Sequence, residues 1–487
     1  MEKSVSRRKS NSKIIHSVIG VAIMIFFQLL PLNLPNVTST GMQVLGIFIG
    51  TIYLWTTVDP LWSSLLSVVI LGFSSYGTMS EVLAQYLGSS VVVQLFFIMA
   101  FVAALVYYKV TLHIGHFFLT RKFTNGRPWL FTFVILLGSF LLSAFVNCFA
   151  PIFLFWPIMY DVFEEVGFKK GAKYPKLMVI LIVVSALLGF PVAPYMQNSL
   201  ALLSNYRKIT EGKVFINDGL FFIFAFTMGI LMLAVLVLFT KYVLHPDVTP
   251  LKTLKVEDLE KNPLPPMDFT QKVLFISFIV YIFAMLLPTL LSGIPFMKYI
   301  STTSIGFATL FVALLTAVMV DGKPIVDFGK IMEKDFAWTT FFLCATAILL
   351  GSVLTNKSTG ITAFLNTILS PIFKGMSGIT FTIVLLITAV ILTNLCNSLV
   401  IGMILQPVVM TYCAVSGVNA APIITLLISF VLLSAAVTPA ASPFAAMLFS
   451  NTEWLKPSDI YKYSGIYVFI ELVLILLIGI PFVNVLM

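Results

Sequence analysis

Long apolar runs alternate with short polar stretches along almost the whole chain. A helix needs about 20 apolar residues to cross the hydrocarbon core of a bilayer, and most of these runs approach that length. The pattern therefore predicts membrane-crossing helices rather than the half-polar elements of a soluble domain. The predicted spans are 14–31, 40–57, 60–74, 89–110, 217–243, 270–289, 302–320, 336–355 and 463–485.

Two apolar segments have a different character. Residues 128–161 are bounded on both sides by Lys and Arg, which cluster on the cytoplasmic face of membrane proteins. This segment is expected to enter and leave by one face, as a re-entrant hairpin with Asn147 near its turn. Residues 378–411 repeat the arrangement around Asn397, and in both segments a proline follows the asparagine ten residues later.

Two other apolar segments are predicted to be broken helices. Residues 174–202 contain Gly189-Phe190-Pro191-Val192-Ala193-Pro194, and residues 421–450 contain Val437-Thr438-Pro439-Ala440. Proline removes a backbone donor and clashes with the preceding turn, so an unwound centre is expected in each. Irregular backbone is tolerated at membrane depth only where protein buries it or water lines it.

The order of elements occurs twice, which predicts an internal repeat of opposite orientation. Short amphipathic or interfacial pieces are expected at 78–88, 112–127 and 358–374. The fold class is an all-α polytopic membrane protein: an inverted repeat of five spans each, one extra N-terminal span, two hairpins and two broken helices. The units are a tail and extra span (1–35), the first repeat (36–245), a linker (246–268) and the second repeat (269–487).

Composition supports a membrane protein. The chain is 59% hydrophobic and 10% charged, too apolar a balance for a soluble surface. The net charge of +9 is explained by basic residues flanking spans, so no nucleic-acid partner is expected. The basic start lacks a small-residue cleavage site after its apolar stretch and is interpreted as a retained span. The four cysteines lack paired spacing, so neither disulfides nor a metal site is expected.

The positive charges also predict orientation. Of 29 Lys and Arg, six fall on the side opposite the N-terminus, which leaves 23 on its own side. The N-terminus is therefore expected to be cytoplasmic, and eleven crossings would place the C-terminus outside a plasma membrane. The six are Arg207, Lys208, Lys213, Lys298, Lys357 and Lys374.

Two interrupted apolar segments in corresponding halves indicate a secondary transporter. Asn147, Asn397 and Ser398 are the side chains expected to contact substrate; the alternative is that these asparagines only cap or join helices. A channel would need a continuous pore, and an enzyme would need clustered acids, histidines or metal ligands, so no enzyme is expected. We expect alternating access, in which hairpins and broken helices move against a fixed scaffold.

The stretches LGIFIGTIYLWTTVDPLWSSLLSVVILGF, DFAWTTFFLCATAILLGSVLTNKSTG and AAVTPAASPF, with the two asparagine-tipped hairpins, resemble the divalent anion:sodium symporters of the ion transporter superfamily. The resemblance implies a dicarboxylate, citrate or sulfate substrate, sodium coupling, and an elevator motion in a homodimer. That family has Ser-Asn-Thr at both tips and a Thr-Pro turn in each broken helix. Here the tips read Val146-Asn147-Cys148 and Cys396-Asn397-Ser398, and the turns read Ala193-Pro194 and Thr438-Pro439.

The resemblance and the residues together give the candidate site. Substrate-binding candidates are Asn147, Cys148, Asn397, Ser398, Thr438, Pro439, Ala193 and Pro194. Neither tip nor break contains Lys, Arg or His, so bound cations, with Na⁺ as the favoured ion, are expected to balance an anion; a substrate of lower charge is the alternative. Cation-binding candidates are Ser143, Asn147, Val192, Asn394, Asn397 and Val437.

Glu471 is the one carboxylate well inside a predicted span. An acid within the membrane is a functional hypothesis by default, here a proton site. The alternative is a protonated or hydrogen-bonded group at a helix interface. A dicarboxylate carrier coupled to sodium is the leading hypothesis, while a sodium-independent anion exchanger, a proton-coupled carrier and a channel stay open.

Overall fold

The computed structural model describes most of the chain, and nearly all of it is helical. The described residues are 2–29, 34–119, 122–210, 212, 215–253, 265–291, 293–320, 322–354, 356–361, 363–364, 367–368, 371 and 375–487. Within them the only sheet is the antiparallel pair of two-residue strands β1 (Met319–Val320) and β2 (Lys323–Pro324). The prediction of an all-α polytopic fold is confirmed.

The chain begins with helices that pack in order along the sequence. Helix α1 is followed by α2, which begins after a Thr38 cap, and by α3, whose first turn is capped by Asp59. A capping box of Thr78 and Glu81 starts α4, the predicted amphipathic piece. The bounds are α1 (Glu2–Leu29), α2 (Ser39–Thr57), α3 (Pro60–Gly72), α4 (Met79–Leu87), α5 (Ser90–Tyr107) and α6 (Val110–Leu119).

The predicted hairpin and broken helix of the first half are both present. A turn at Val146–Cys148 separates the arms of the hairpin, and residues 190–196 separate the two halves of the broken helix. Helix α11 ends in a π-helical turn, η2. The bounds are η1 (Lys122–Thr124), α7 (Pro128–Phe145), α8 (Phe149–Glu165), α9 (Lys173–Gly189), α10 (Gln197–Ile209), α11 (Asp218–Phe239), η2 (Thr240–Leu244) and η3 (Thr249–Thr253).

The connection to the second half differs from the simple spans predicted. The segment expected to span 302–320 is divided into a short 3-10 turn, the 11-residue α15 and strand β1. Helix α16 meets α17 at an angle of 87°. The centre of the linker at 254–264 lies outside the described residues, as do eight of the 17 residues of the interfacial helix expected at 358–374. The bounds are α13 (Phe269–Leu290), α14 (Pro295–Thr303), η4 (Ser304–Gly306), α15 (Phe307–Ala317), α16 (Phe328–Lys334), α17 (Trp338–Leu354) and η5 (Lys357–Thr359).

The second half then repeats the order hairpin, broken helix, closing helix. Residues 434–442 form the unwound centre of the second broken helix. The closing helix α23 continues through a π-helical turn into α24. The bounds are α19 (Gly378–Leu395), α20 (Ser398–Ser416), α21 (Ala420–Leu433), α22 (Pro443–Ser450), α23 (Pro457–Leu474), η6 (Ile475–Gly479) and α24 (Ile480–Leu486).

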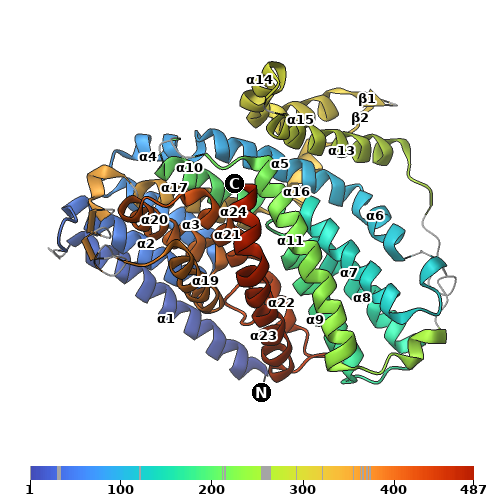
Figure 1. The fold of residues 1–487 in the computed structure, drawn as a ribbon. Helices are drawn as coiled ribbons and strands as arrows, with labels where there is room; N and C mark the ends of the chain where they lie inside the picture. Colours follow the sequence, from blue (N-terminus) through green and yellow to red (C-terminus); the bar gives the residue numbers. More distant parts are fainter. Residues whose placement is uncertain are drawn as a thin grey trace.

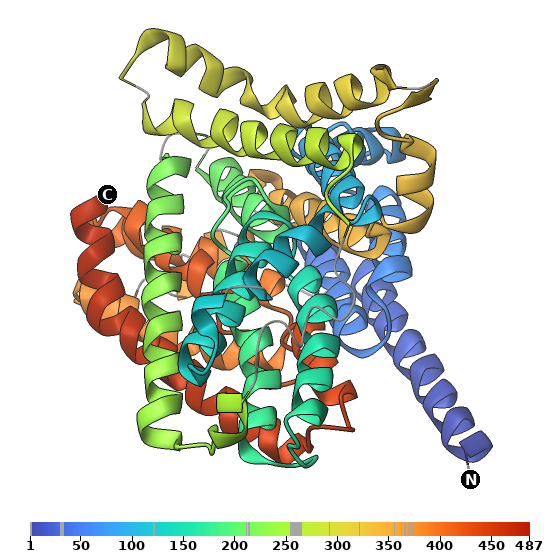
Figure 2. The same ribbon diagram turned by 90° about the vertical axis from the view of Figure 1, so that its right-hand side faces the viewer.

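The helices form two packed groups. Hairpins and broken helices pack among themselves and against α11 and α23, whereas α1 to α5 pack with α13, α15, α16 and α17. Helices α13, α14 and α15 form a layer over one end of the bundle (Figure 1), and α1 projects from the opposite end (Figure 2). The groups meet mainly where α10 lies against α17 and α11 lies against α13, and α6 packs between them on α5 and α7.

Seven helices of the described chain are long and apolar enough to cross a membrane, or eight if the bent pair α16–α17 is one span. Eleven crossings were expected from the sequence. The two sets also differ in membership, because three of the seven helices (α7, α19 and α20) are hairpin arms that the sequence does not count as crossings. The apolar helices Lys13–Leu29, Pro60–Gly72, Ser304–Ala317 and Ala420–Leu433 are each 17 residues or shorter. The number of crossings and the side of each terminus stay predictions.

One glycine fixes how the first hairpin packs on the first broken helix. A Cβ at Gly189 would lie 2.2 Å from the carbonyl oxygen of Phe140, on α7. No side chain fits at that distance, so α7 and α9 can approach this closely only with glycine there. At this distance Ser139 and Ser185 each donate a hydrogen bond from the hydroxyl to a backbone carbonyl of the other helix. The hairpin is therefore firmly attached to the helix that precedes the break.

A buried amide pair joins the two halves of the chain. Asn205 on α10 donates from Nδ2 to Oε1 of Gln406 on α20 at 2.7 Å, and Gln406 Nε2 donates to the Leu202 carbonyl at 3.0 Å. Both side chains are almost fully buried. This network fixes the second half of one broken helix against the hairpin of the other repeat.

Replacing Gln406 by Leu is expected to lower the melting temperature of the detergent-purified protein. The Asn205 amide would be left without its partner, at a cost of about 1–3 kcal/mol. The double replacement Asn205→Leu with Gln406→Leu should recover part of the loss, since neither amide is then orphaned. An unchanged melting temperature for Gln406→Leu would contradict the importance of this contact.

Candidate functional site

The first hairpin turns at Asn147, which is half-buried. Its Oδ1 accepts from the backbone N–H of Ala150 at 2.7 Å and so supports the first turn of α8. Its neighbour Cys148 is completely buried, and Ser143 lies beside that thiol one turn earlier. Among these three predicted site residues, Asn147 is the one whose side chain reaches open space.

The second hairpin turns at Asn397 in the same way. Asn397 is the cap of α20, and its Oδ1 accepts from the backbone N–H of Leu399 at 3.0 Å. Ser398 is buried, and its backbone N–H donates to the carbonyl of Ala441 at 3.1 Å. The tip is therefore bonded directly to the unwound centre of the second broken helix.

Asn394 holds that unwound centre in place. Its Nδ2 donates to the carbonyls of Val390 (2.9 Å) and Ser434 (3.0 Å), and its Oδ1 accepts from the N–H of Val437 (2.9 Å). The Thr438 hydroxyl donates to the Asn394 carbonyl at 2.5 Å. Both amide hydrogens of Asn394 are thus committed to the fold, and one lone pair of Oδ1 is left for a further partner.

The two breaks differ in exposure. Residues 190–197, which include the predicted site residues Val192, Ala193 and Pro194, are all buried. In the second break Val437 and Thr438 are half-buried and Pro439 is exposed. The buried first break directly follows Gly189, where α9 contacts the first hairpin closely.

Both hairpin tips contact one segment of the second broken helix, residues 441–444. Ser398 bonds to Ala441, and the ring of Phe149, next to the first tip, lies 4.6 Å from the ring of Phe444 between centroids. Phe190, at the first break, lies 5.2 Å from the same Phe444 ring. Both hairpin tips and the first break are thereby brought to the second break. From the sequence only the meeting of the two tips is predicted.

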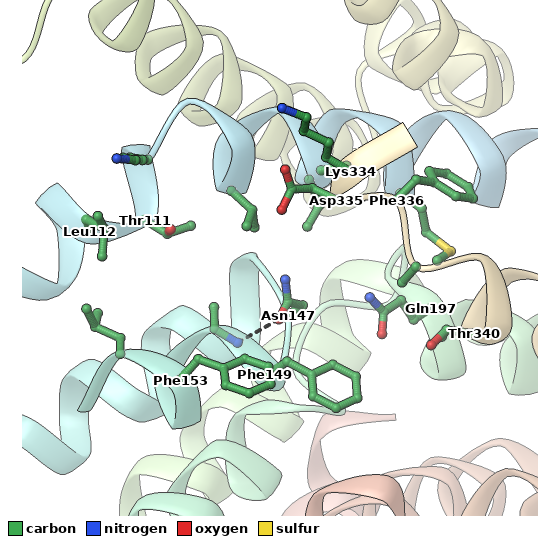
Figure 3. Close-up of a pocket in the computed structure, with 18 residues that line it drawn as sticks. Thr111, Leu112, Asn147, Phe149, Phe153, Gln197, Lys334, Asp335, Phe336 and Thr340 are labelled. Atoms are coloured by element: carbon green, nitrogen blue, oxygen red, sulfur yellow. Dashed lines mark hydrogen bonds between the residues drawn. The ribbon is translucent and has the colours of Figure 1, made fainter. Parts of the chain in front are cut away.

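A cavity of about 590 Å³ opens beside the first tip. Asn147 and Gln197 lie on one wall, and Lys334 and Asp335 lie on the wall that faces them (Figure 3). Lys109, between α5 and α6, also lines it, while Phe149, Phe153 and Leu154 provide an apolar side. Of the predicted site residues, Asn147 belongs to this cavity.

Two cavity residues have unusual backbone conformations. Lys109 and Gln197 have φ of +59° and +27°, a region that side chains other than glycine rarely adopt. Such conformations persist only where surrounding structure imposes them, and they cluster at functional sites. Sequence reasoning missed Lys109, Lys334 and Gln197 as site residues; the amide after two prolines was a usable signal for Gln197, whereas the lysines come from distant segments.

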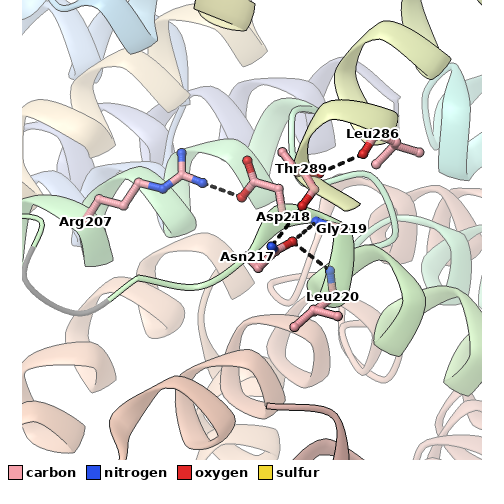
Figure 4. A network of polar contacts seen from close by, with 7 residues as sticks. All are labelled: Arg207, Asn217, Asp218, Gly219, Leu220, Leu286 and Thr289. Atoms are coloured by element: carbon pink, nitrogen blue, oxygen red, sulfur yellow. Dashed lines mark hydrogen bonds and ion pairs between the residues drawn. The ribbon is translucent and has the colours of Figure 1, made fainter. Parts of the chain in front are cut away.

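A polar network connects the first broken helix, α11 and α13. Arg207, at the end of α10, pairs with Asp218 at the start of α11. The neighbouring Asn217 caps α11 and donates from Nδ2 to the carbonyl of Thr289 on α13 at 3.0 Å (Figure 4). The end of the first broken helix is therefore fixed to α13 in this conformation.

Two helical hairpins packed against two interrupted helices, in an all-α polytopic membrane protein, are typical of a secondary transporter. The sequence matches the family model for the sodium:sulfate symporter transmembrane region over residues 11–487. The chain belongs to this family, which confirms the resemblance to divalent anion:sodium symporters.

The fold is also that of a solved transporter. The YdaH transporter of Alcanivorax borkumensis, whose structure is described as having an unusual topology, superposes with a TM-score of 0.56 at 11% identity. The match covers 91% of this chain and 98% of that chain. A search of curated protein sequences gives no match.

Thiol labelling tests the second tip. Cys396 is half-buried, whereas Cys148 and Cys344 are fully buried. A methanethiosulfonate reagent is expected to modify Cys396 faster than Cys148 by roughly tenfold or more, because modification needs exposure. A transported anion should slow the reaction at Cys396. The measurement uses variants that retain a single cysteine; equal labelling of Cys148, or no protection by any anion, would contradict this location of the site.

Proposed function

We propose that the protein carries a small divalent anion, with a dicarboxylate as the favoured substrate, by sodium-coupled alternating access. The observation that carries the proposal is the meeting of both hairpin tips at residues 441–444. Helices α8, α10, α20 and α22 all begin beside a tip or a break. Helix N-termini offer unpaired N–H groups and favour negative charge, so this convergence suits an anion.

The side-chain donors fit the same substrate. Asn147 and Asn397 each use Oδ1 to cap a helix, which leaves the amide hydrogens directed to other partners. Ser398 adds a hydroxyl beside the second amide. The proposed substrate site is completed by residues that contribute buried side chains or backbone groups around it. These are Cys148, Ala193, Pro194, Thr438 and Pro439.

Two lysines from the proposed scaffold lie in the cavity beside the first tip. Lys109 and Lys334 line the cavity beside Asn147 together with one acid, Asp335, which gives a net charge of +1 at the rim. A cleft of one sign raises the local concentration of oppositely charged solute. We assign this cavity to the path by which the anion reaches the tips.

Sodium coupling is supported by oxygen atoms that lack partners. The hydroxyls of Thr393 and Ser434 are buried without a hydrogen-bond partner in the described chain, and both lie beside the Asn394 clamp. Unwound backbone and nearby oxygens coordinate Na⁺ in transporters built from broken helices. We add these two hydroxyls to the proposed cation ligands Ser143, Asn147, Val192, Asn394, Asn397 and Val437.

The proposed motion is of the elevator type. Hairpins, broken helices, α11 and α23 would move as one unit, because they pack among themselves. The remaining helices would form the scaffold and the contact of a homodimer. The contact between Asn217 and Thr289 would then break and reform during each cycle. We place the protein in the plasma membrane, with the N-terminus cytoplasmic, the C-terminus extracellular and the two repeats in opposite orientation.

Replacing Asn397 by Ala is expected to abolish uptake of labelled dicarboxylate into proteoliposomes. Asn419→Ala is the matched control, because Asn419 caps α21 through the same kind of bond, from Oδ1 to the N–H of Ala421 at 3.1 Å, and is exposed. Each variant should lose about 1 kcal/mol of helix capping. If both variants transport equally well, Asn397 is only a cap and the proposed site is wrong.

Ser434→Ala is expected to raise the sodium concentration that gives half-maximal uptake, by about tenfold for the loss of one ligand. Ser429→Ala is the control, since its hydroxyl is equally buried and without a partner but lies within the regular part of α21. Uptake is measured against sodium concentration at constant ionic strength. Identical sodium dependence in the two variants would exclude Ser434 as a ligand.

A further inference from the structure

Glu471 occupies an environment in which a charged carboxylate is not stable. It lies in α23, its side chain has 0% exposure, and neither carboxylate oxygen has a hydrogen-bond partner within the described part of the chain. An ionised carboxylate without a partner in an apolar interior is very costly, and such a group takes up a proton instead. The geometry of the site therefore corresponds to a neutral acid.

No cation in the neighbouring helices offsets this charge. Helix α23 packs against α9, α11, α19 and α22. Neither α19 nor α22 contains a charged or titratable side chain. The titratable groups of α9 lie in its first turn, and that of α11 lies at its start and is paired with Arg207. These groups are Lys173, Tyr174, Lys176 and Asp218.

The other titratable groups of this region are also accounted for. Asp459 on α23 pairs with Lys176 at 3.0 Å, twelve residues before Glu471, which is about 18 Å along a helix. The Tyr467 hydroxyl, one turn before Glu471, bonds to the Thr240 hydroxyl at 3.0 Å. The groups farther from Glu471 are Tyr461, Lys462 and Tyr463 on α23, and Lys241 and Tyr242 in η2.

Two irregular turns flank the acid. Thr240, which holds Tyr467, begins the π-helical turn η2 of α11, and four residues after Glu471 the π-helical turn η6 begins in its own helix. Isolated π turns within helices are rare and are frequently found at functional sites. They are also positions at which helix geometry is already interrupted, and thus where packing around Glu471 can change.

We propose that Glu471 is a proton-binding site within the moving unit. In the conformation described here the carboxyl group holds a proton. During the transport cycle its surroundings open to water, the proton leaves one carboxylate oxygen for a water molecule, and a proton is regained when the site closes. This inference rests on the proposed transport cycle and adds proton movement to it; it requires no oxidant or other reactant.

The test compares wild type with Glu471→Gln, which keeps the shape of a neutral acid but cannot release a proton. In proteoliposomes with saturating sodium, wild type should acidify or alkalinise the lumen as labelled dicarboxylate enters, as reported by an enclosed pH-sensitive dye. Glu471→Gln should lose this proton movement and retain exchange of internal for external substrate. Asp459→Asn, on the same helix but at a paired and partly exposed site, should keep both.

Infrared spectroscopy gives a readout that does not depend on transport. Purified wild type should show the carbonyl band of a protonated carboxylic acid shielded from solvent, and Glu471→Gln should lack it. Absence of that band in wild type, or proton movement in Glu471→Gln equal to that of wild type, would overturn the proposal. Absence of any anion uptake by folded wild type would instead refute the proposed function, while the band would still report on Glu471.

Discussion

Inside a bilayer, backbone polar groups need partners from the protein, and this constraint governs the interrupted helices of this transporter. At the second break, the Asn394 side chain donates to the Ser434 carbonyl and accepts from the Val437 N–H. The Thr438 hydroxyl donates to the Asn394 carbonyl. The Ala441 carbonyl accepts a hydrogen bond from the backbone N–H of Ser398 at the second tip. Tip and break therefore supply hydrogen-bond partners to one another's backbone.

The two halves share an order of elements but not an environment. The first break is buried under the hairpin that packs at Gly189, while the second exposes Pro439. Helix α10 of the first half bonds to the second hairpin through Asn205 and Gln406. Phe149 of the first half packs against Phe444 of the second. Each half therefore contributes contacts that the other half needs, and in the conformation described here the two breaks are unequally exposed.

Charge near the first tip comes from segments outside the two hairpins. Lys109 and Lys334 line the cavity beside the first tip, whereas neither tip carries a cation of its own. In the described chain, the hairpins and the elements packed around them contain a fully buried acid, Glu471, and the hydroxyls of Thr393 and Ser434 without hydrogen-bond partners. An anion would thus meet fixed positive charge first and amides, helix ends and bound ions afterwards.

The sequence by itself determined the class of protein, the hairpins, and the position of each break, because proline, glycine and isolated asparagines act on the backbone locally. It also indicated Asn147 and Asn397 as tip residues. Only the tertiary structure decided that Asn394 is a clamp, that both tips meet at residues 441–444, and that Lys109, Lys334 and Gln197 share a cavity. Those relations join residues far apart in the chain, and periodicity along a sequence carries no information on which distant side chains become neighbours.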